Sequence, residues 1–347
     1  MSDELLSIDD LKVGFATDDG LVQAVDGVSF DVKRGEIVAV VGESGSGKSV
    51  TGMTLMGLTR GPNARITGSA TLDGQELLTA SNEDLRKIRG NDIAMVFQDP
   101  ISSLNPVYRV GWQIVEQIRT HHPEVSKADA MERAVTLMER VGIPRAAERL
   151  RSYPHEFSGG MRQRVMIAMA LSCSPKLLIA DEPTTALDVT IQAQILDELR
   201  QLREDTNAGI ILVTHDLAVV ADIADRVVVM YSGRVVEQGT LDDLFYDPQH
   251  PYTWGLLGSI TRVDGDRGKR LPAIAGAPPS LLATPKGCHF KPRCPHAFDR
   301  CDEVPALESR VAEAPQHADR CWLTPEQKRE RRIVDGQIGL AATQVKA

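Results

Sequence analysis

Long hydrophobic runs are missing from this 347-residue sequence: no stretch approaches the roughly 18 consecutive apolar residues that a membrane-spanning helix requires. The first ten residues, MSDELLSIDD, are acidic and lack the apolar core of a secretory signal, so we expect the chain to stay in the cytoplasm. Basic residues are outnumbered, 39 against 48 acidic ones, which gives a formal net charge of −9. That balance argues against a broad nucleic-acid-binding surface.

Cysteine is scarce, with five residues in the chain, and four of the five follow residue 259. Because cytoplasmic cysteines are mostly reduced, a group of this kind is more typical of a metal site than of disulfide bonds. The chain as a whole is too long for one ordinary hydrophobic core, and we therefore expect two domains.

Short apolar runs recur along the first two thirds of the chain. Such runs are typical of strands buried on both faces, and helix-like segments such as Met161–Leu171 and Ile191–Glu204 lie between several of them. This alternation predicts an α/β domain with a mainly parallel sheet. The predicted strands are Ile37–Val41, Ile93–Phe97, Leu177–Ala180, Ile210–Val213 and Val227–Met230.

About 80 residues separate the second predicted strand from the third, and their pattern is mostly helical. With candidate helices at Arg109–His121, Lys127–Val141 and Met161–Leu171, we expect a helical subdomain, about 99–173, inserted into the α/β core. The composition then changes after about Ser259 to a segment rich in glycine, proline and charge. We therefore divide the chain into a domain over 1–258 and a C-terminal extension over 259–347, whose end, from Thr324, we expect to be partly disordered.

The stretch GESGSGKS, at Gly42–Ser49, fits the phosphate-loop pattern G-x-x-x-x-G-K followed by Ser or Thr, and it lies between a predicted strand and a plausible helix. Glycines let backbone N–H groups surround a phosphate, and the helix N-terminus adds positive potential. Lys48 would reach the β- and γ-phosphates and Ser49 would contact Mg²⁺. The predicted nucleotide contacts here are Gly42, Ser44, Gly45, Ser46, Gly47, Lys48, Ser49 and Val50.

Two carboxylates, Asp181 and Glu182, follow the apolar run LLIA. Carboxylates at the carboxyl end of a buried parallel strand lie where α/β sheets bind their ligands. We expect Asp181 to bind Mg²⁺ and Glu182 to polarise the attacking water.

The stretch FSGGMRQR places Ser158, Gly159 and Gly160 directly before a predicted helix. The phosphate loop, SGGMRQR and LLIADEP, in this order, resemble the ATP-binding-cassette (ABC) ATPases over roughly residues 5–258. The resemblance implies that Ser158–Gly160 is the ABC signature, which faces the phosphate loop of a second cassette. The Ser158 hydroxyl, the glycine backbone without side chains and the N-terminus of the following helix are all suited to contact a γ-phosphate.

The same resemblance implies roles for four further residues. Gln98, in VFQDP, is the glutamine that senses Mg²⁺ and the attacking water; Asp188, in ALD, belongs to the D-loop that communicates across the dimer. His215, in LVTHD, is placed to contact the γ-phosphate. Phe15 is the aromatic residue expected to stack on adenine, although its loop, FATDDGLVQAV, is longer than usual and an apolar packing role is the alternative.

The fold that follows from the resemblance is an α/β ABC nucleotide-binding domain. It comprises a RecA-like parallel-sheet core, the inserted helical subdomain and an antiparallel β part. A small C-terminal domain containing the four cysteines is added to it.

Several stretches resemble the dipeptide/oligopeptide importer cassettes more specifically, among them VFQDPISSLNP and HPYTWGLL. This implies a peripheral subunit on the cytoplasmic face that hydrolyses ATP to import peptides. Its partners would be a second ATPase subunit, often a paralogue, two membrane permease subunits and an extracytoplasmic solute-binding protein. The segment Asp99–Val110 would receive a coupling helix, and because nickel importers share much of the pattern, the solute stays open.

Two other functions compete with import. The first is an ABC ATPase that acts on nucleic acid, which the single cassette, the acidic balance and HPYTWGLL argue against. The second is a nucleotide-binding regulator without turnover, which an intact Glu182 and His215 argue against. We therefore expect no nucleic-acid partner.

The four C-terminal cysteines, Cys288, Cys294, Cys301 and Cys321, have the spacing C-x5-C-x6-C-x19-C. Four thiolates suit an iron–sulfur cluster or tetrahedral zinc, but the spacing lacks the C-x2-C pairs of structural zinc sites. It resembles the cysteine segment of peptide-importer cassettes, some of which hold a four-iron, four-sulfur (4Fe-4S) cluster. We expect such a cluster, with zinc or unligated structural thiols as alternatives, and a packing role for Cys173.

Overall fold

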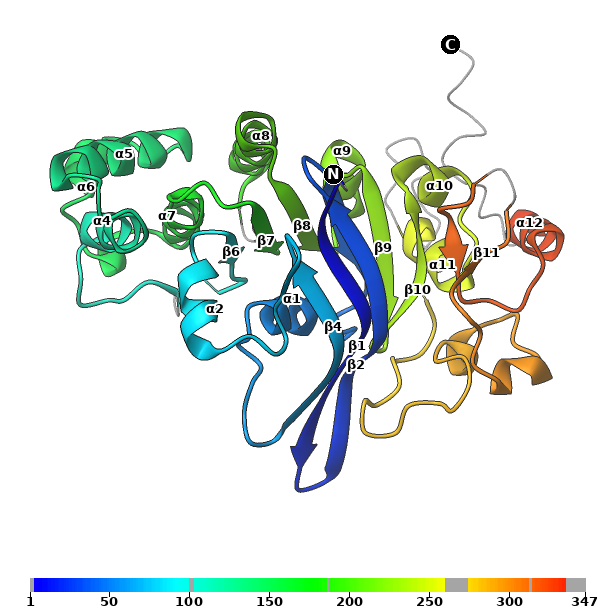
Figure 1. Cartoon of the computed structure of the whole chain (residues 1–347). Helices are drawn as coiled ribbons and strands as arrows, with labels where there is room; N and C mark the ends of the chain where they lie inside the picture. Colours follow the sequence, from blue (N-terminus) through cyan, green and yellow to red (C-terminus); the bar gives the residue numbers. More distant parts are fainter. Residues whose placement is uncertain (1–2, 100–102, 186, 260–273, 312–313, 335–347) are drawn as a thin grey trace, which may run out of the picture.

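Two β-sheets organise the part of the chain that the computed structural model describes, residues 3–99, 103–185, 187–259, 274–311 and 314–334. The larger sheet has eight strands in the order β11-β12-β10-β9-β3-β8-β7-β6, and the smaller has four in the order β2-β1-β4-β5 (Figure 1). The helical segments α4 to α7 lie to one side of the larger sheet and the C-terminal extension to the other (Figure 1).

The centre of the larger sheet is parallel, as the sequence predicts. Strand β3 pairs in parallel with β8 and β9, and β7 with β6 and β8. Every residue of β3, β6, β7 and β8 is buried, because helices cover one face and the smaller sheet with α1 covers the other. These strands are β3 (Ile37–Val41), β6 (Ile93–Val96), β7 (Leu177–Asp181), β8 (Gly209–Thr214) and β9 (Arg226–Tyr231).

The smaller sheet is antiparallel and is built on the hairpin of β1 (Glu4–Thr17) and β2 (Gly20–Lys33). The expected long loop FATDDGLVQAV is therefore mostly strand, with a turn at Asp18 and Asp19, and Phe15 pairs with Val22. Alternating buried positions in both strands explain the hairpin, because one face packs on the core. The sheet is completed by β4 (Ala64–Leu72) and β5 (Gln75–Glu76).

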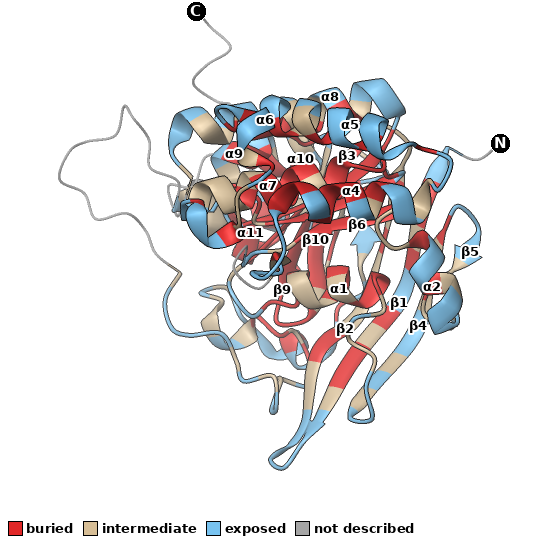
Figure 2. Ribbon diagram, turned by 90° about the vertical axis from the view of Figure 1, so that its left-hand side faces the viewer, coloured by how far each residue is buried: buried red, intermediate tan, exposed pale blue. Residues whose placement is uncertain are grey.

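All three helices predicted between β6 and β7 are present (Figure 2). The first two bury one face and expose the other, whereas the third, Gly159–Leu171, is buried or half-buried along its length after Gly159. Ser126 begins the second of them, since its Oγ accepts a hydrogen bond from the Asp129 N–H at 3.1 Å. No helix of the described ranges combines the length and apolar composition needed to cross a bilayer. The helical segments are α1 (Lys48–Leu55), α2 (Asn82–Ile88), α4 (Val110–His121), α5 (Lys127–Arg140), α6 (Ala146–Arg149), η1 (Pro154–Glu156), α7 (Gly159–Leu171), α8 (Val189–Thr206), α9 (Leu217–Ile223), α10 (Leu241–Tyr246) and α11 (Pro251–Gly258).

The C-terminal extension continues the larger sheet, which the sequence did not indicate. Strand β12 (Ala318–Asp319) pairs antiparallel with β10 (Arg234–Thr240) and with β11 (Glu308–Ser309). The segment from Thr324, expected to be partly disordered, contains a helix, and residues 260–273 and 335–347 lie outside the described part. The remaining elements are η2 (Lys291–Arg293), η3 (Asp299–Asp302) and α12 (Pro325–Val334).

Buried charges attach this extension to the sheet. The Glu237 carboxylate, fully buried on β10, accepts hydrogen bonds from the backbone N–H groups of Gln249 and His250 and lies 2.7 Å from His317 Nε2. Burial alone would raise the pKa of Glu237, but the bond to His317, the charge of His317 and the bonds to Thr253 and Gln249 together outweigh burial, so the pKa is lowered. Beside it, the buried Lys328 ammonium donates to Asp319 at 2.7 Å.

We predict that Glu237→Ala lowers the free energy of unfolding by about 3–5 kcal/mol, because it leaves buried donors, including His317, without their acceptor. Glu308→Ala is the matched control, since Glu308 is exposed on β11, and it should change that free energy by no more than about 0.5 kcal/mol. Urea unfolding measures both. Equal midpoints for the two variants would show that Glu237 does not hold the extension.

Candidate active site

The phosphate loop connects β3 to α1, as predicted, and its shape depends on glycine. Gly42 and Gly47 have φ angles of 152° and 102°, which L side chains rarely adopt. A Cβ on Gly42 would lie 2.1 Å from the Met230 carbonyl oxygen, and one on Gly47 would lie 2.5 Å from that of Ala24. The loop therefore packs its backbone tightly at both ends and leaves Ser44 and Gly45 exposed between them.

Lys48 begins α1 and is buried, with 7% of its surface exposed. Its ammonium group donates to the carbonyl oxygens of Gly42 at 2.7 Å and Glu43 at 2.9 Å. Burial lowers the pKa of Lys48, and the nearby carboxylates of Glu182 and Asp181 act in the opposite direction. A cation is thus held under the loop, where it can reach an anionic group bound above it.

Asp181 is the last residue of β7 and fits a divalent cation. Its side chain is buried, its Oδ1 has no hydrogen-bond partner within the described ranges, and it is hydrogen bonded to Ser49. Burial raises the pKa of Asp181, with the Ser49 bond and Lys48 opposing it. A buried carboxylate oxygen without a partner is costly unless a cation or proton satisfies it, so Asp181 and Ser49 are suited to hold Mg²⁺.

Glu182 follows at the carboxyl end of β7, and the structure brings Gln98 and His215 to it. Gln98 Nε2 donates to Glu182 Oε2 at 3.1 Å, Thr185 Oγ1 donates to the same oxygen at 3.0 Å, and His215 Nδ1 lies 3.1 Å from Oε1. Burial would raise the pKa of Glu182, but the bonds to His215 and Thr185, together with the charges of His215 and Lys48, outweigh burial and lower the pKa. Glu182 is therefore a carboxylate at neutral pH, ready to accept a proton.

The backbone of Glu182 is held in an unusual conformation, with a φ of 49°. Its N–H donates to the Val213 carbonyl oxygen at 2.8 Å, and Gln163 Nε2 donates to the carbonyl oxygens of Glu182 and Pro183 at 3.3 and 2.7 Å. Non-glycine residues at positive φ often mark functional sites. The supporting residues Gln163 and Thr185 were not predicted, although Gln163 lies inside the quoted stretch SGGMRQR and Thr185 lies between LLIADEP and ALD.

Ser158 begins α7, as its position before the helix predicts. Its Oγ accepts a hydrogen bond from the Met161 N–H at 3.3 Å. Ser158 and Gly159 are exposed, and a Cβ on Gly159 would meet nothing within 4 Å. This helix N-terminus is therefore open to another molecule, while Gln163, one turn later, contacts the residues that directly follow β7.

The other predicted contact residues lie in two different surroundings. Asp188 begins α8 by accepting a hydrogen bond from the Ile191 N–H at 3.0 Å, and Ala186 before it lies outside the described part. Phe15, near the end of β1, is partly buried against the core, and Val50 is packed against the same core from α1.

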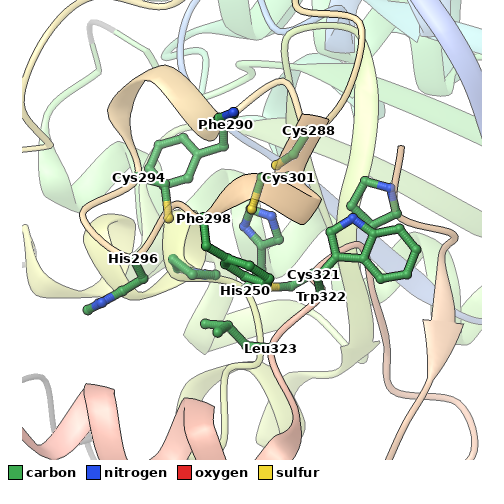
Figure 3. A pocket seen from close by; sticks show the side chains of 13 residues that line it. His250, Cys288, Phe290, Cys294, His296, Phe298, Cys301, Cys321, Trp322 and Leu323 are labelled. Carbon is green, nitrogen blue, oxygen red and sulfur yellow. The ribbon is translucent and has the colours of Figure 1, made fainter. Parts of the chain in front are cut away.

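The expectation of a metal at the four C-terminal cysteines was wrong. All four line one pocket, together with aromatic side chains such as Phe290, Phe298 and Trp322 (Figure 3). Within the described ranges, however, no group of three or more His, Cys, Asp or Glu residues is arranged to hold a metal ion, which excludes both the predicted iron–sulfur cluster and its zinc alternative. Burial raises the pKa of Cys288, and that of Cys294 and Cys321 to about 12, so these are neutral thiols in an apolar pocket. The pocket cysteines are Cys288, Cys294, Cys301 and Cys321.

Comparison with known proteins assigns this site to a family. Residues 25–185 match the ABC transporter family, and residues 236–301 match the C-terminal region of oligopeptide/dipeptide transporters. The oligopeptide transport ATP-binding protein OppD of Escherichia coli is 54% identical over 88% of this chain and 90% of its own. The dipeptide transport ATP-binding protein DppD of Bacillus subtilis is 49% identical over 96% and 98%.

Solved structures agree with this assignment. A dimeric bacterial ABC transporter cassette superposes with a TM-score of 0.63 at 26% identity, covering 68% of this chain and 99% of its own. The same cassette in a post-hydrolysis state, bound to ADP and Pi, gives a TM-score of 0.62 at 26% identity over the same shares of the two chains. The parallel core, the antiparallel sheet and the inserted helices are thus those of an ABC ATPase. The chain therefore belongs to the ABC transporter ATP-binding proteins of the oligopeptide and dipeptide transport family.

Proposed function

We propose that this chain hydrolyses ATP to drive the import of peptides through separate membrane permease subunits. The observation that carries the hydrolytic part is the Glu182 carboxylate, which hydrogen bonds with Gln98, Thr185 and His215 beside Asp181. The relatives' names, which describe oligopeptide and dipeptide transport, support peptides as the cargo.

In the proposed mechanism, Lys48 and the N–H groups of the phosphate loop bind the nucleotide's phosphates. Asp181 and Ser49 would hold Mg²⁺, which would offset phosphate charge. Glu182 accepts the proton of the attacking water, and Gln98 and His215 orient the carboxylate and the water. Phe15 stacks on adenine at the end of β1, where its ring is partly exposed.

A second cassette would complete the site. The exposed Ser158 and Gly159 would meet the γ-phosphate bound by the partner, with Asp188 beside them at the start of α8. We propose a paralogous ATPase subunit as this partner. A phosphate between helix N-termini of two chains would account for the exposed Gly159 after Ser158.

We further propose that the chain lies at the cytoplasmic face of the membrane, bound to two permease subunits that receive cargo from an extracytoplasmic solute-binding protein. Residues 100–102 of the predicted docking segment Asp99–Val110 lie outside the described part, and an exposed aromatic pair stands at the end of the segment. Tyr108 and Trp112 stack with ring centroids 4.2 Å apart and are 44% and 48% exposed. The proposed units are 1–258, with the helical subdomain at about 99–173, and the extension 259–347.

We predict that Lys48→Ala weakens ATP binding roughly thirtyfold, because a charge-assisted contact worth about 2 kcal/mol is lost. Peptide uptake into proteoliposomes that contain the permeases, the partner ATPase and the binding protein should stop with this variant. Lys176→Ala is the control: Lys176 is 48% exposed and pairs with Asp92 at 3.1 Å on the surface, so binding and uptake should be unchanged. ATP-dependent uptake that persists with Lys48→Ala, or wild-type protein that moves no peptide, would contradict the proposed function.

A further inference from the structure

An arginine of the C-terminal extension forms an ion pair with the phosphate loop. Arg293, in η2, binds the Glu43 carboxylate with both ends of its guanidinium group, Nη1 to Oε2 at 2.6 Å and Nη2 to Oε1 at 3.0 Å. Glu43 is the second residue of the phosphate loop, 250 positions earlier in the chain. Paired, bidentate contacts of this type are among the stronger and more directional hydrogen bonds in proteins.

Arg293 is itself fixed from the other side. Its Nε donates to the Ala275 carbonyl oxygen at 3.0 Å, Nη2 donates to that of Ile274 at 3.3 Å, and Nη1 donates to the Tyr231 hydroxyl at 3.2 Å. Only 4% of the Arg293 side chain is exposed, against 29% of that of Glu43. The arginine is thus a rigid part of the extension, and the carboxylate is the part that depends on it.

The backbone of the same loop residue is tied down as well. The Glu43 N–H donates to the Tyr252 hydroxyl at 2.8 Å, and its carbonyl oxygen accepts from Lys48 at 2.9 Å. His289, also in the extension, has its Nδ1 2.8 Å from the carbonyl oxygen of Ser232, in the turn beside the loop. The extension therefore holds both the loop and its neighbouring turn.

Charge gives this contact a consequence for nucleotide binding. A free carboxylate at Glu43 would stand at the loop that receives the phosphates of ATP, and like charges at such a distance repel. Arg293 neutralises that carboxylate and turns it toward the extension. Removal of the arginine alone leaves the repulsion, whereas removal of both charges together does not.

We propose that Arg293 is a positioning residue for ATP binding, and that docking of the C-terminal extension and binding of ATP at the phosphate loop favour each other. The proposal rests on the ATP site of the proposed function and assigns a role to a residue outside its motifs. Because coupling between two sites is reciprocal, bound ATP should also stabilise the docked extension.

The test is the Kd for Mg-ATP of the full-length chain, measured with a fluorescent ATP analogue. Arg293→Gln should raise Kd roughly tenfold, and Arg293→Lys, which keeps the charge but not the bidentate geometry, roughly threefold. The double variant Glu43→Gln with Arg293→Gln should return Kd to within about threefold of the wild type. Arg300→Gln is the matched control in the same extension, since Arg300 is exposed and its guanidinium group lies over Trp322 at 3.9 Å, and it should leave Kd unchanged.

Thermal unfolding, with and without ATP, separates positioning from plain stability. The ATP-induced rise in Tm should shrink for Arg293→Gln and return in the double variant. The proposal is overturned if Arg293→Gln binds ATP within twofold of the wild type, or if the double variant is as weak as Arg293→Gln. Wild-type protein that binds ATP but transports no peptide would instead refute the proposed function and leave this inference standing.

Discussion

The Glu182→Gln variant will bind ATP but hydrolyse it roughly 10²–10⁴-fold more slowly than the native chain. Glutamine preserves the size of the side chain and can still bond with Gln98 and Thr185, but it cannot accept a proton from water. The bonds to His215 and Thr185 lower the pKa of Glu182, so the native carboxyl group is ionised at neutral pH. The variant therefore loses the proton acceptor of the hydrolysis step and keeps ATP binding. Phosphate release by the assembled transporter measures the effect.

The same variant should accumulate the ATP-bound pair of cassettes, visible by size-exclusion chromatography, because binding continues while hydrolysis stops. Glu198→Gln is the matched control: Glu198 pairs with Arg140 at 2.8 Å on the surface of α8 and should leave turnover unchanged. Near-normal phosphate release by Glu182→Gln would remove this residue from the role of general base.

The parallel core was predictable because its strands are buried on both faces. Such strands read as unbroken apolar runs, and all five runs are strands of the larger sheet. The hairpin at Phe15 was not predicted as a hairpin, because half-buried strands carry polar residues on their outer face and resemble loops. Asp18 and Asp19, in FATDDGLVQAV, mark its turn.

The candidate site was predictable where a motif fixes a local turn. The spacing of Gly42 to Ser49 sets a loop between a strand and a helix, and Asp181 and Glu182 end a strand by their position after an apolar run. The residues that support them follow no such rule. Gln163 contacts Glu182 only because α7 packs beside β7, and that packing is a tertiary property.

The structure of the C-terminal extension could not be predicted from the sequence. Glu237 and Lys328 are ordinary surface residues by type, yet both are fully buried. Glu237 pairs with His317, 80 positions later in the chain, and Lys328 pairs with Asp319 of β12, which the sheet itself buries. The four cysteines favoured a metal site because thiolates are good metal ligands, but the type of ligand does not determine how the four sulfur atoms are arranged in space. Burial among aromatic rings is the alternative environment, and it is the one that the structure shows.

The second large effect concerns Ser158, and it should appear on the partner's nucleotide. Ser158 lies exposed at the N-terminus of α7, so an arginine there blocks close approach of a second phosphate loop without disturbing Lys48 of the same chain. We expect Ser158→Arg to reduce hydrolysis at the partner's site roughly 10²-fold, the order of loss seen when one preorganised donor to a reacting group is removed.

This prediction is tested by measuring hydrolysis at each of the two nucleotide sites separately. For this, one cassette at a time carries either a nucleotide photolabel or an inactive phosphate loop. Ser126→Arg is the matched control, because Ser126 begins α5 of the same helical region through an equivalent 3.1 Å bond to the Asp129 N–H. That variant loses a helix cap worth about 1 kcal/mol but should keep hydrolysis intact. A blocked helix end on one chain can affect a phosphate bound by the partner only when the two chains meet there. If Ser158→Arg stops hydrolysis only of the nucleotide bound by Lys48 of the same chain, the signature does not act across the interface.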